Sequence, residues 1–522
     1  MLGALVGTLT TTFAYKKHSV ELDVANGTSS AKLDALLRLL ERNYVDPIDN
    51  DSITDRLCAT ILTTLDPHSV YLSSKDFERE AEALRGNFEG IGTVLRKLND
   101  TVCATEIIAG SPSEAAGIQP ADRFVEVDGH NITGENFDSV VNMIRGPRRS
   151  TVTIKIIRPG EKNPRTVSII RDVIPTPSTN YSGMLDKTTG YIRLDRFSET
   201  THDEFCQAVF DLKRKGMKNL VLDLRNNGGG LMSAAIDICD ELLPGREMIV
   251  YTEGAHQRRR EQHSRPGGLF CEGNLMVMID EFSASASEIV AGAVQDNDRG
   301  IIVGRRSFGK GLVQQQYELP DKSVARITIS RYYTPAGRSI QRPYDRGTDE
   351  YYTDFIQNII DEYKGDSLLS YINDSTPYYT SKGRIVYGGG GIYPDHTIHY
   401  KTDENIVYYN RMLNKGIIFD LAFDIVSAEG RTIKAKYPDE ESFVKNYKIS
   451  DATLQTLFAR GEKGGIARDS KSISRYSEEM RSRLKAEIGT MLYSQSVFYT
   501  IQLKYDPELK EALDIMNKEI HK

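Results

Sequence analysis

The sequence predicts a multidomain α/β protein, and three observations carry this prediction. The chain has 522 residues, which is enough for two to four domains of ordinary size. Between residues 189 and 304, short apolar runs alternate with helical stretches, as is typical of a largely parallel sheet covered by helices. The stretches before and after that region show different patterns of apolar, glycine and turn residues, so the α/β part is expected to be one domain among several.

Composition limits the classes of function. With 39% hydrophobic and 27% charged residues, the chain is expected to be a soluble globular protein with sizeable cores. The net charge of −7 argues against general nucleic-acid binding, which needs an excess of lysine and arginine. The one dense basic run, HQRRREQHSR at 256–265, is interpreted as a solvated loop. Five scattered cysteines without CxxC spacing argue against a disulfide framework or a zinc knuckle, and no metal is expected.

The N-terminal segment 1–28 begins with a run of mostly apolar or small residues that ends before Lys16 and Lys17. This run is short for a membrane span and lacks the basic start of a full signal peptide. We expect it to be the remnant of a signal or membrane anchor that begins upstream of residue 1.

Region 29–86 is predicted to be helical. Apolar residues at helical spacing predict a helix over 31–45, with one face made by Leu33, Leu36, Leu37, Leu40 and Tyr44. A second helix is expected over 52–65, and Asn50 and Asp51 are suitable N-cap types before it.

Region 87–172 is predicted to be a compact β-rich module, because glycine and aspartate turns separate short β-branched runs. A short helix is expected near its end, with an apolar face made by Phe137, Val140, Val141 and Ile144. The run STVTIKIIRPG then alternates as a strand does.

Region 173–401 supplies the α/β pattern. Strands are expected at GYIRLD, NLVLDL, LMVMID and GIIVG, where apolar runs are bounded by turn residues. Helices are expected between them, at 201–215, 231–243 and 284–295. The runs GLVQQQYELP and SVARITISRYYTP predict an antiparallel pair.

Region 402–522 is predicted to be a mostly helical extension. In its last helix Asp506 is the expected N-cap and Pro507 the first helical residue. The apolar face of that helix is made by Leu509, Leu513 and Met516.

Two stretches carry side chains that are suited to nucleophilic chemistry. FSASASEIVAGAVQD, at 282–296, places three serines on alternate positions just before a helix. Such a serine is either an ordinary helix cap or a nucleophile at the positive end of the helix dipole. In RSFGKGLVQQQ, at 306–316, Lys310 is either a surface turn residue or a base whose pKa is lowered by burial. A Ser–Lys pair is a known variant of the activated hydroxyl.

Two glycine turns can offer backbone N–H groups to an anion. LDLRNNGGG, at 222–230, suits a tetrahedral oxyanion, and FEGIGT, at 88–93, suits a terminal carboxylate beside a strand edge that takes an added peptide strand. A plain turn is the alternative in both places. There is no GxSxG elbow and no HExxH motif, and His68 in DPHS is interpreted as a structural turn residue.

Taken together, ten segments in order resemble the C-terminal processing peptidases, also called tail-specific proteases. They lie between roughly residue 40 and residue 397: NYVDP, LDPHSVYLS, GNFEGIGTVL, GSPSEAAGIQPADRFVEVDG, MIRGPRRSTVTIKIIRPG, DLRNNGGGL, FSASASEIVAGAVQD, GRRSFGKGLVQ, YYTPAGRSIQ and GGGIYPD. The resemblance implies a crotonase-like α/β protease core, over 173–401, with an inserted β-rich PDZ domain over 87–172.

The resemblance also implies roles for single residues. Carried over to this sequence, Ser285 is the nucleophile, Lys310 is the general base, and Gln314 orients the lysine. Ser283 and Ser287 are then neighbours and not nucleophiles.

An oxyanion hole is implied at the start of the helix that follows Ser285. It would combine the backbone N–H of Ala286 with that of Gly228 or Gly229, and the choice between the glycines stays open. Glu288, in the first turn of the same helix, is expected to complement the helix dipole.

The PDZ domain would capture the C-terminus of a substrate through the N–H groups of Gly90, Ile91 and Gly92. The resemblance therefore implies a serine endopeptidase without a cofactor, acting on exported or unfolded proteins with apolar C-termini. It implies a periplasmic or cell-envelope location. Extension 402–522 departs from the family pattern and is expected to package the core, bind an adaptor or form a homo-oligomer. A longer loop near 254–268 is expected to shape access to the site.

Two other classes of function compete with this one. A catalytically inactive PDZ scaffold or chaperone would bind tails without cleaving them, but it needs no serine, lysine and glutamine set. An acyl-CoA enzyme would share the crotonase-like fold, but the PDZ insert and the Ser–Lys pair argue against it.

Overall fold

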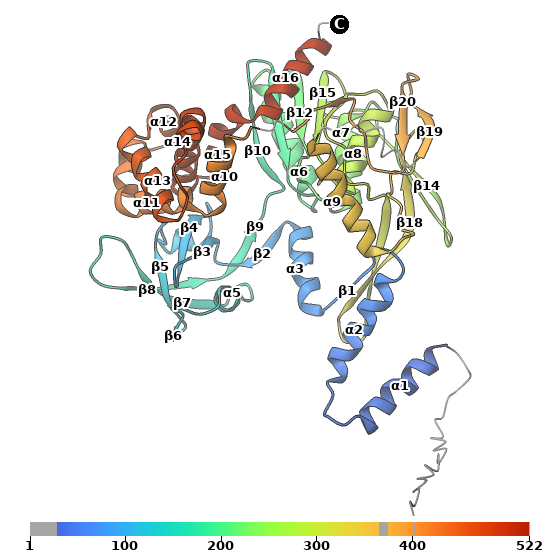
Figure 1. Cartoon of the computed structure of the whole chain (residues 1–522), viewed down its shortest axis with the longest axis horizontal. Helices are drawn as coiled ribbons and strands as arrows, with labels where there is room; N and C mark the ends of the chain where they lie inside the picture. Colours follow the sequence, from blue (N-terminus) through green and yellow to red (C-terminus); the bar gives the residue numbers. More distant parts are fainter. Residues whose placement is uncertain (1–28, 365–373, 401–402, 521–522) are drawn as a thin grey trace, which may run out of the picture. The chain divides into compact units, whose positions relative to one another are not determined.

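The structure is a computed structural model that describes residues 29–364, 374–400 and 403–520 (Figure 1). The predicted signal or anchor remnant, 1–28, lies outside these residues. Within them, no helix combines the length and the apolar character that a membrane span requires. The chain divides into two compact units, Met1–Leu62 and Thr63–Lys522, which are described separately. The predicted boundaries at 86/87, 172/173 and 401/402 stay predictions.

The first unit contains helix α1 (Ser29–Asn43) and nearly all of α2 (Asn50–Thr63). Both lie close to the predicted positions. The cap of α2 differs from the prediction, because the Asp49 carboxylate accepts the N–H groups of Asp51 and Ser52 at 3.1 and 3.2 Å. An aspartate before a helix caps it through this contact, so Asn50 is already inside the helix.

The second unit begins with a short strand where the sequence predicted only helices. Strand β1 (Val70–Leu72) pairs antiparallel with β18 (Val324–Tyr333), and helix α3 (Ser74–Arg85) follows it. A strand of three residues is too short to show a recognisable two-residue alternation in the sequence. It also depends on pairing with a strand far along the chain.

The predicted β-rich module forms a sheet in the order β3-β4-β5-β7-β8, with β6 paired to β5. Its strands are β3 (Thr93–Leu98), β4 (Thr101–Ile107), β5 (Arg123–Val127), β6 (His130–Asn131), β7 (Thr151–Ile157) and β8 (Arg165–Ile170). Helices α4 (Pro112–Ala115) and α5 (Phe137–Ile144) accompany the sheet. The chain enters and leaves the module through β2 (Asn87–Gly90) and β9 (Asp172–Pro175), which pair antiparallel, so the module is an insertion.

The α/β region is built on a six-stranded sheet in the order β10-β11-β12-β15-β16-β21. Its strands are β10 (Thr179–Met184), β11 (Thr189–Leu194), β12 (Asn219–Asp223), β15 (Asn274–Ile279), β16 (Ile301–Gly304) and β21 (His396–Thr397). All neighbours pair parallel except β10 and β11. The parallel sheet predicted from the apolar runs is thus confirmed.

Helices cover both faces of this sheet. Leu220 and Leu222 point into one core, which is packed by α6 (Thr201–Arg214), α7 (Met232–Leu242) and α8 (Ala286–Asp296). Val221 points to the other face, as the two-residue period of a strand requires, and meets α16 (Pro507–Ile520). Asp506 caps α16 as predicted, since its carboxylate accepts the N–H groups of Glu508 and Leu509.

A second sheet has the order β1-β18-β13-β14, with β17 also paired to β18. Its other strands are β13 (Met248–Gly254), β14 (Gln257–His263) and β17 (Leu312–Glu318). The predicted solvated loop at 256–265 is wrong, because β14 is an exposed edge strand paired antiparallel to β13. Arginine-rich edges of this kind discourage further strand pairing. The remaining elements of the region are helix α9 (Thr348–Lys364) and the hairpin β19 (Asp374–Tyr379) with β20 (Ile385–Gly388).

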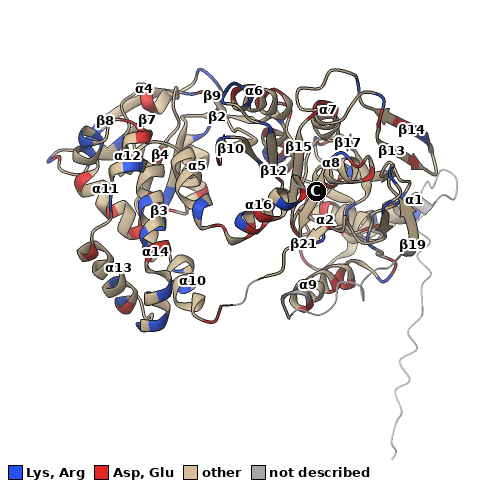
Figure 2. Ribbon diagram, turned by 90° about the horizontal axis from the view of Figure 1, so that it is seen from above, with Lys and Arg blue, Asp and Glu red and all other residues tan. Residues whose placement is uncertain are grey.

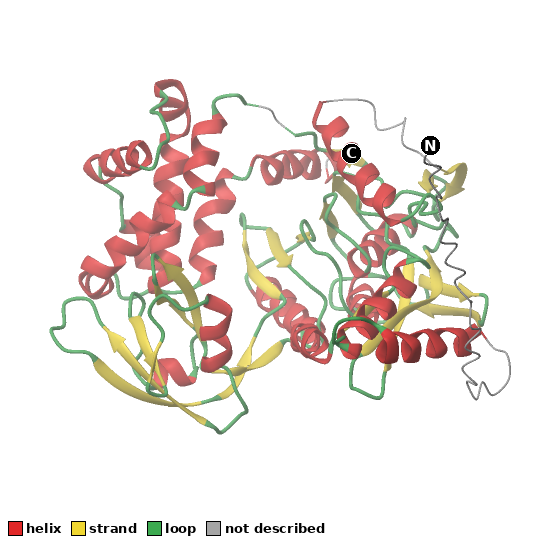
Figure 3. Cartoon of the chain, turned by 60° about the horizontal axis from the view of Figure 1, so that its bottom comes forward, coloured by secondary structure: helices red, strands yellow, loops and turns green. Residues whose placement is uncertain are grey.

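After β21 the described residues form helices and no strands (Figure 3). They are α10 (Ile406–Asn414), α11 (Ile417–Lys436), α12 (Glu440–Asn446), α13 (Asp451–Lys463), α14 (Ser470–Leu492), α15 (Gln495–Gln502), a 3-10 turn (Leu503–Tyr505) and α16. Helices α10 to α15 share a core that includes Cys103 and Ala121 of the β-rich module. The helical extension predicted from the sequence is confirmed, and it packs against that module.

Candidate active site

Three loops carry the predicted site residues, and each follows a parallel strand. The glycine loop, 224–231, follows β12; the serine loop, 280–285, follows β15; and the lysine loop, 305–311, follows β16. Because the strands are parallel, their carboxyl ends lie at one edge of the sheet, where open α/β sheets place their sites. Residues far apart in sequence therefore meet there.

Ser285 sits at the last position before α8 with φ 56° and ψ −110°. A positive φ strains the backbone of a non-glycine residue, so contacts from the surrounding structure must hold this turn. The hydroxyl of Ser283 donates to the Leu224 carbonyl, and that of Ser287 donates to the Asn227 carbonyl, both at 2.8 Å. The two flanking serines thus tie the serine loop to the glycine loop, while Ser285 faces a pocket.

The Lys310 side chain is largely buried at the end of the lysine loop, just before β17. Its Nζ donates to Oε1 of Gln314 at 3.0 Å, and Nε2 of Gln314 donates to the His68 carbonyl at 2.5 Å. Burial lowers the pKa of Lys310, and the positive charge of Arg326 lowers it further. The Lys310 amine therefore becomes neutral at a lower pH than the amine of an exposed lysine does.

Glu288 joins the serine loop to the lysine loop. Its Oε2 accepts the N–H groups of Ser285 at 2.7 Å and Lys310 at 2.9 Å. Its Oε1 accepts the Ser307 hydroxyl and the Gly309 N–H, both at 2.6 Å. Burial raises the pKa of Glu288 to about 7, although these four donors act in the opposite direction. The predicted role in complementing the helix dipole therefore omits its main contacts.

Tyr332 joins the same two loops from the other side. This residue of β18 is buried, and its hydroxyl lies 2.6 Å from the Lys310 carbonyl and 3.1 Å from the Ser285 carbonyl. The sequence offered no signal for this role, because the tyrosine lies in an ordinary alternating strand.

His68 is a buried turn residue, as its position in DPHS suggested. The Asp66 carboxylate accepts the N–H groups of His68 and Ser69, which fixes the turn. The His68 ring lies 3.1 Å from the Tyr351 hydroxyl. Burial and the nearby Lys310 lower the pKa of His68 to about 3, so its imidazole is neutral near pH 7. Its backbone carbonyl accepts the Gln314 amide, which links the turn to Lys310.

The glycine loop presents its backbone to Ser285. The Gly229 N–H donates to Oδ1 of Asn227 at 2.9 Å. Across the described residues, no acceptor is found for the N–H of Gly228 or of Ala286. A Cβ on Gly229 would lie 2.9 Å from the Cβ of Ser285, whereas one on Gly228 would meet nothing within 4 Å. Gly229 therefore packs against the serine turn, and Gly228 borders open space.

The three loops surround a pocket of about 780 Å³, which is large enough for several residues of an extended peptide. Its lining combines predicted site residues with apolar ones: Ser285, Lys310, Gln314, Gly228, Gly229, Leu231, Met232 and Ile289. Backbone N–H groups, a hydroxyl and an amine at one pocket wall can support acyl transfer.

The predicted carboxylate-binding loop lies just before β3. The Ile91 carbonyl accepts the Ser113 N–H, and the Gly92 carbonyl accepts the Ile108 N–H. The N–H groups of Ile91 and Gly92 find no acceptor in the part of the chain that is described. Gly90 is the last residue of β2. Strand β3 is at the end of its sheet, so its outer edge can take a further strand.

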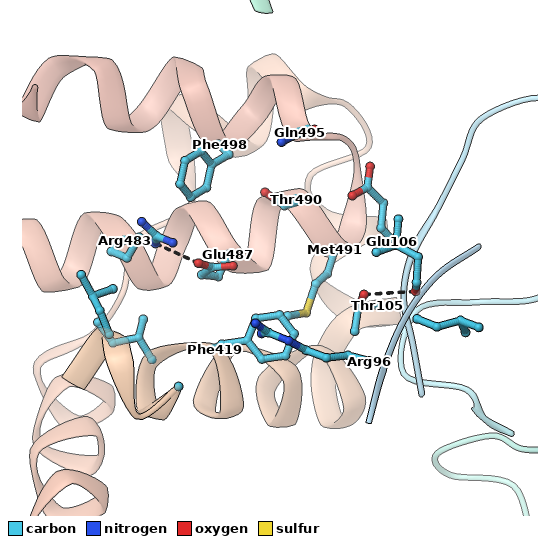
Figure 4. A pocket seen from close by; sticks show the side chains of 15 residues that line it. Arg96, Thr105, Glu106, Phe419, Arg483, Glu487, Thr490, Met491, Gln495 and Phe498 are labelled. Carbon is cyan, nitrogen blue, oxygen red and sulfur yellow. Dashed lines mark hydrogen bonds and ion pairs between the residues drawn. The ribbon is translucent and has the colours of Figure 1, made fainter. Parts of the chain in front are cut away.

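A second pocket, of about 440 Å³, lies where β3 and β4 meet the C-terminal helices (Figure 4). The Arg96 guanidinium lies 3.8 Å from the centre of the Phe419 ring, a cation–π contact between the β-rich module and α11. Burial raises the pKa of Glu106, on the same wall, to about 7. This face of the module is therefore closely associated with the extension.

One group of potential metal ligands was overlooked in the sequence. His202, Cys206 and Glu241 have ligand atoms within 4.8 Å of one another, the first two being four residues apart on α6. Nε2 of His202 lies 3.0 Å from Oε1 of Glu241 and 3.3 Å from Sγ of Cys206, distances that hydrogen bonds explain. None of the three lines the pocket at Ser285.

The fold and this pocket define a serine-type peptidase with an inserted PDZ domain, and comparisons with known proteins agree. A model described as peptidase family S41 matches residues 188–349, a PDZ-domain model matches 104–158, and a model of a family of unknown function matches 408–494. The carboxy-terminal-processing protease of Bartonella bacilliformis is 34% identical over 316 residues, covering 60% of this chain and 72% of that protein.

Two further proteins are similar. The carboxyl-terminal-processing protease of Synechocystis is 34% identical over 312 residues, covering 58% of this chain and 72% of that protein. A solved structure of a photosystem II D1 C-terminal processing protease is 30% identical, covers 59% of this chain and 88% of that chain, and gives a TM-score of 0.33. The chain belongs to the carboxy-terminal-processing proteases, as its sequence motifs predicted.

Proposed function

We propose that this serine peptidase works by a Ser–Lys mechanism, with Ser285 as nucleophile and Lys310 as general base. The observation that carries the proposal is the shared support of the two residues. Glu288 accepts both backbone N–H groups, while Gln314 holds the Lys310 amine beside the pocket that Ser285 lines. A buried lysine with a lowered pKa is suited to accept a proton near neutral pH.

In this mechanism the neutral Lys310 takes the hydroxyl proton as Ser285 Oγ attacks the scissile carbonyl. The tetrahedral intermediate collapses, the C–N bond breaks, and the leaving amine takes that proton from Lys310. Water then attacks the acyl-enzyme while Lys310 accepts a proton from it. The second tetrahedral intermediate collapses, the ester C–O bond breaks, and Lys310 returns the proton to Ser285 Oγ as the new C-terminus is released. Gln314 keeps the amine in position throughout by accepting one of its hydrogens.

The N–H groups of Gly228 and Ala286 are the proposed oxyanion hole. Both lack an acceptor within the described ranges, whereas the Gly229 N–H is already engaged by Asn227. Ala286 also opens helix α8, so the positive end of the helix dipole favours negative charge there.

Substrates are proposed to be proteins whose free, apolar C-termini bind the PDZ domain. The N–H groups of Ile91 and Gly92 and the free edge of β3 support this, because they suit a terminal carboxylate and an added strand. We further propose export to the periplasm or cell envelope, unfolded or exported proteins as substrates, and an adaptor or a second copy as a partner of 402–522.

The test is digestion of an unfolded protein that ends in an apolar tail. Ser285→Ala and Lys310→Ala should each lose cleavage, while Ser182→Ala, which removes an exposed hydroxyl on β10, should cleave as the unchanged protein does. Equal cleavage by Ser285→Ala would overturn the nucleophile assignment. Tail binding by every variant without cleavage by any would indicate a peptide-binding scaffold instead.

A further inference from the structure

Helix α16 begins with two acidic residues that reach the loops of the candidate active site. Asp506 caps the helix, and Glu508 follows in its first turn. Leu509, Ala512 and Met516 pack α16 onto the face of the sheet opposite α6, α7 and α8. Figure 2 shows acidic and basic residues close together along α16. Arg225 follows β12 and Arg305 follows β16, so the ion pairs of Asp506 and Glu508 with these arginines place the start of α16 at the carboxyl ends of the parallel strands.

Arg225 is the first target of these carboxylates, and it belongs to the glycine loop. Its guanidinium lies 2.6 Å from Asp223, 2.7 Å from Asp506 and 2.9 Å from Glu508. Only 9% of the Arg225 side chain is exposed. The neighbouring carboxylates raise the pKa of this arginine against the effect of its burial. Its Nη1 donates to the carboxylates of both Asp506 and Glu508.

Arg305 is the second target, and it opens the lysine loop. Its Nε donates to Glu281 at 2.8 Å, and its Nη1 donates to Glu508 at 2.6 Å. The Arg305 side chain is 5% exposed. Glu508 thus uses Oε2 for Arg225 and Oε1 for Arg305, so one carboxylate joins the glycine loop to the lysine loop.

A buried arginine that loses a carboxylate partner leaves N–H donors unpaired, and the structure around it must shift. Here the shift would move the loop that holds Gly228 or the loop that holds Lys310. Misplacement of a catalytic group by about 1 Å is enough to lower a rate by about 10²-fold. The carboxylates of α16 are therefore well placed to affect catalysis without touching substrate.

We propose that Asp506 and Glu508 are positioning residues, through which the C-terminal extension keeps the glycine loop and the lysine loop in register with Ser285. This inference rests on the proposed Ser–Lys mechanism. It assigns a function to the C-terminal end of the extension that is separate from any partner binding by helices α10 to α15.

The kinetic test compares charge-removing variants with a matched control on the same helix. Asp506→Asn keeps a good capping residue, and Glu508→Gln keeps the side-chain shape, so both remove only the charge. Asp514→Asn removes an exposed charge from α16. We expect kcat to fall at least about 10-fold in Asp506→Asn and Glu508→Gln, with KM changed less than about 2-fold, while Asp514→Asn stays unchanged. Glu508→Asp, which retains charge but is too short to reach both arginines, should be intermediate.

Hydrogen exchange of the full-length protein provides a readout that does not need activity. Amides of 224–231 and 305–311 should exchange faster in Glu508→Gln, while those of β3 and β4 should not change. Unchanged kcat, or a lowered kcat without faster exchange in both loops, would overturn the proposal. The proposed mechanism fails if the protein without any substitution shows no Ser285-dependent cleavage. In that case, faster exchange of both loops in Glu508→Gln would still support the role of Glu508 in holding the two loops. Should Glu508→Gln not fold, Asp506→Asn decides the test: kcat should fall and amides of 224–231 should exchange faster, because Asp506 contacts Arg225. Unchanged kcat or unchanged exchange of 224–231 in that variant would overturn the proposal.

Discussion

The backbone N–H groups of Ser285 and Lys310 donate to the same oxygen, Oε2 of Glu288. Two residues that are 25 positions apart in sequence are thereby held by one acceptor, without using either reactive side chain. Tyr332 completes the arrangement by contacting the carbonyls of both residues. The relative position of the proposed nucleophile and base thus depends on two buried groups that take no part in the chemistry.

Replacing Glu288 by glutamine should impair both stability and catalysis. The amide NH₂ would face two donors that now have an oxygen, and each buried unpaired donor costs about 1–3 kcal/mol. We expect kcat to fall about 10²-fold and the urea midpoint to fall, because the serine and lysine loops lose their common acceptor. Glu253→Gln, at an exposed position of β13, is the matched control and should match the unchanged protein in both measurements.

The pH dependence of kcat/KM should report the pKa of Lys310. Only the neutral amine accepts a proton, so activity should rise with pH through a pKa below that of an ordinary lysine. Arg326→Gln removes the charge that lowers this pKa, so the rising limb should move to higher pH. Arg331→Gln on the same strand should leave the limb in place. A limb unmoved by Arg326→Gln would contradict the assignment of that titration to Lys310.

His68 should make the protein less stable in acid. Its pKa is about 3 in the folded state, against the 6.5 of an exposed histidine, so between these pH values the unfolded chain binds a proton that the folded chain does not. Stability contributed by neutral His68 is therefore present above pH 6.5 and is lost as pH falls toward 3, at up to about 1.4 kcal/mol per pH unit. Urea unfolding at pH 7.5, 6 and 5 should show a shallower loss in His68→Gln than in the unchanged protein. Parallel losses in the two proteins would contradict this account.

The first two of the three consecutive glycines in the glycine loop, Gly228 and Gly229, should differ in their tolerance of alanine. Gly229 has φ 98°, and a Cβ there would lie 2.7 Å from the Ala284 carbonyl oxygen. Gly229→Ala should therefore displace the serine turn and lose most activity, with a lower melting temperature. Gly228→Ala should retain the melting temperature of the unchanged protein, because its Cβ meets nothing within 4 Å. Equal melting temperatures for both variants would argue against this packing.

Tail binding should depend on the turn before β3. Gly92 has φ 79°, and a Cβ there would lie 2.2 Å from the Cβ of Ser111. Gly92→Ala should weaken binding of a fluorescent peptide with an apolar C-terminus at least about 10-fold, because the turn that presents the N–H groups must shift. Gly110→Ala, at a position with φ 74° but open space around its Cβ, controls for backbone strain alone. A peptide with an amidated C-terminus should bind weakly to every variant.

Much of the fold could be predicted from the sequence because its signals are local. The apolar runs of β12, β15 and β16 and the Asp506–Pro507 helix start each depend on neighbouring residues. Strand β14 escaped prediction because it is an exposed edge strand, whose charged residues give no apolar alternation. Strand β1 escaped because it is stabilised by pairing with β18, which lies over 250 residues later.

The candidate site, too, could be predicted only in part. Motif resemblance pointed to Ser285, Lys310 and Gln314, and the structure brings them to one pocket, where their roles stay predictions. The supporting contacts of Glu288 and Tyr332, and the reach of Glu508 to two arginines, arise from tertiary packing. No spacing rule connects such residues, because their proximity exists only after the sheet has formed.

The position of α16 bears on how fragments of this protein should be interpreted. A fragment that ends near residue 401 would keep Ser285, Lys310 and Gln314, and would look complete by its motifs. It would nevertheless lack both acidic partners of Arg225 on α16 and the Glu508 partner of Arg305. Low activity in such a fragment would then reflect missing support for the loops, and would say little about the capacity of the intact chain.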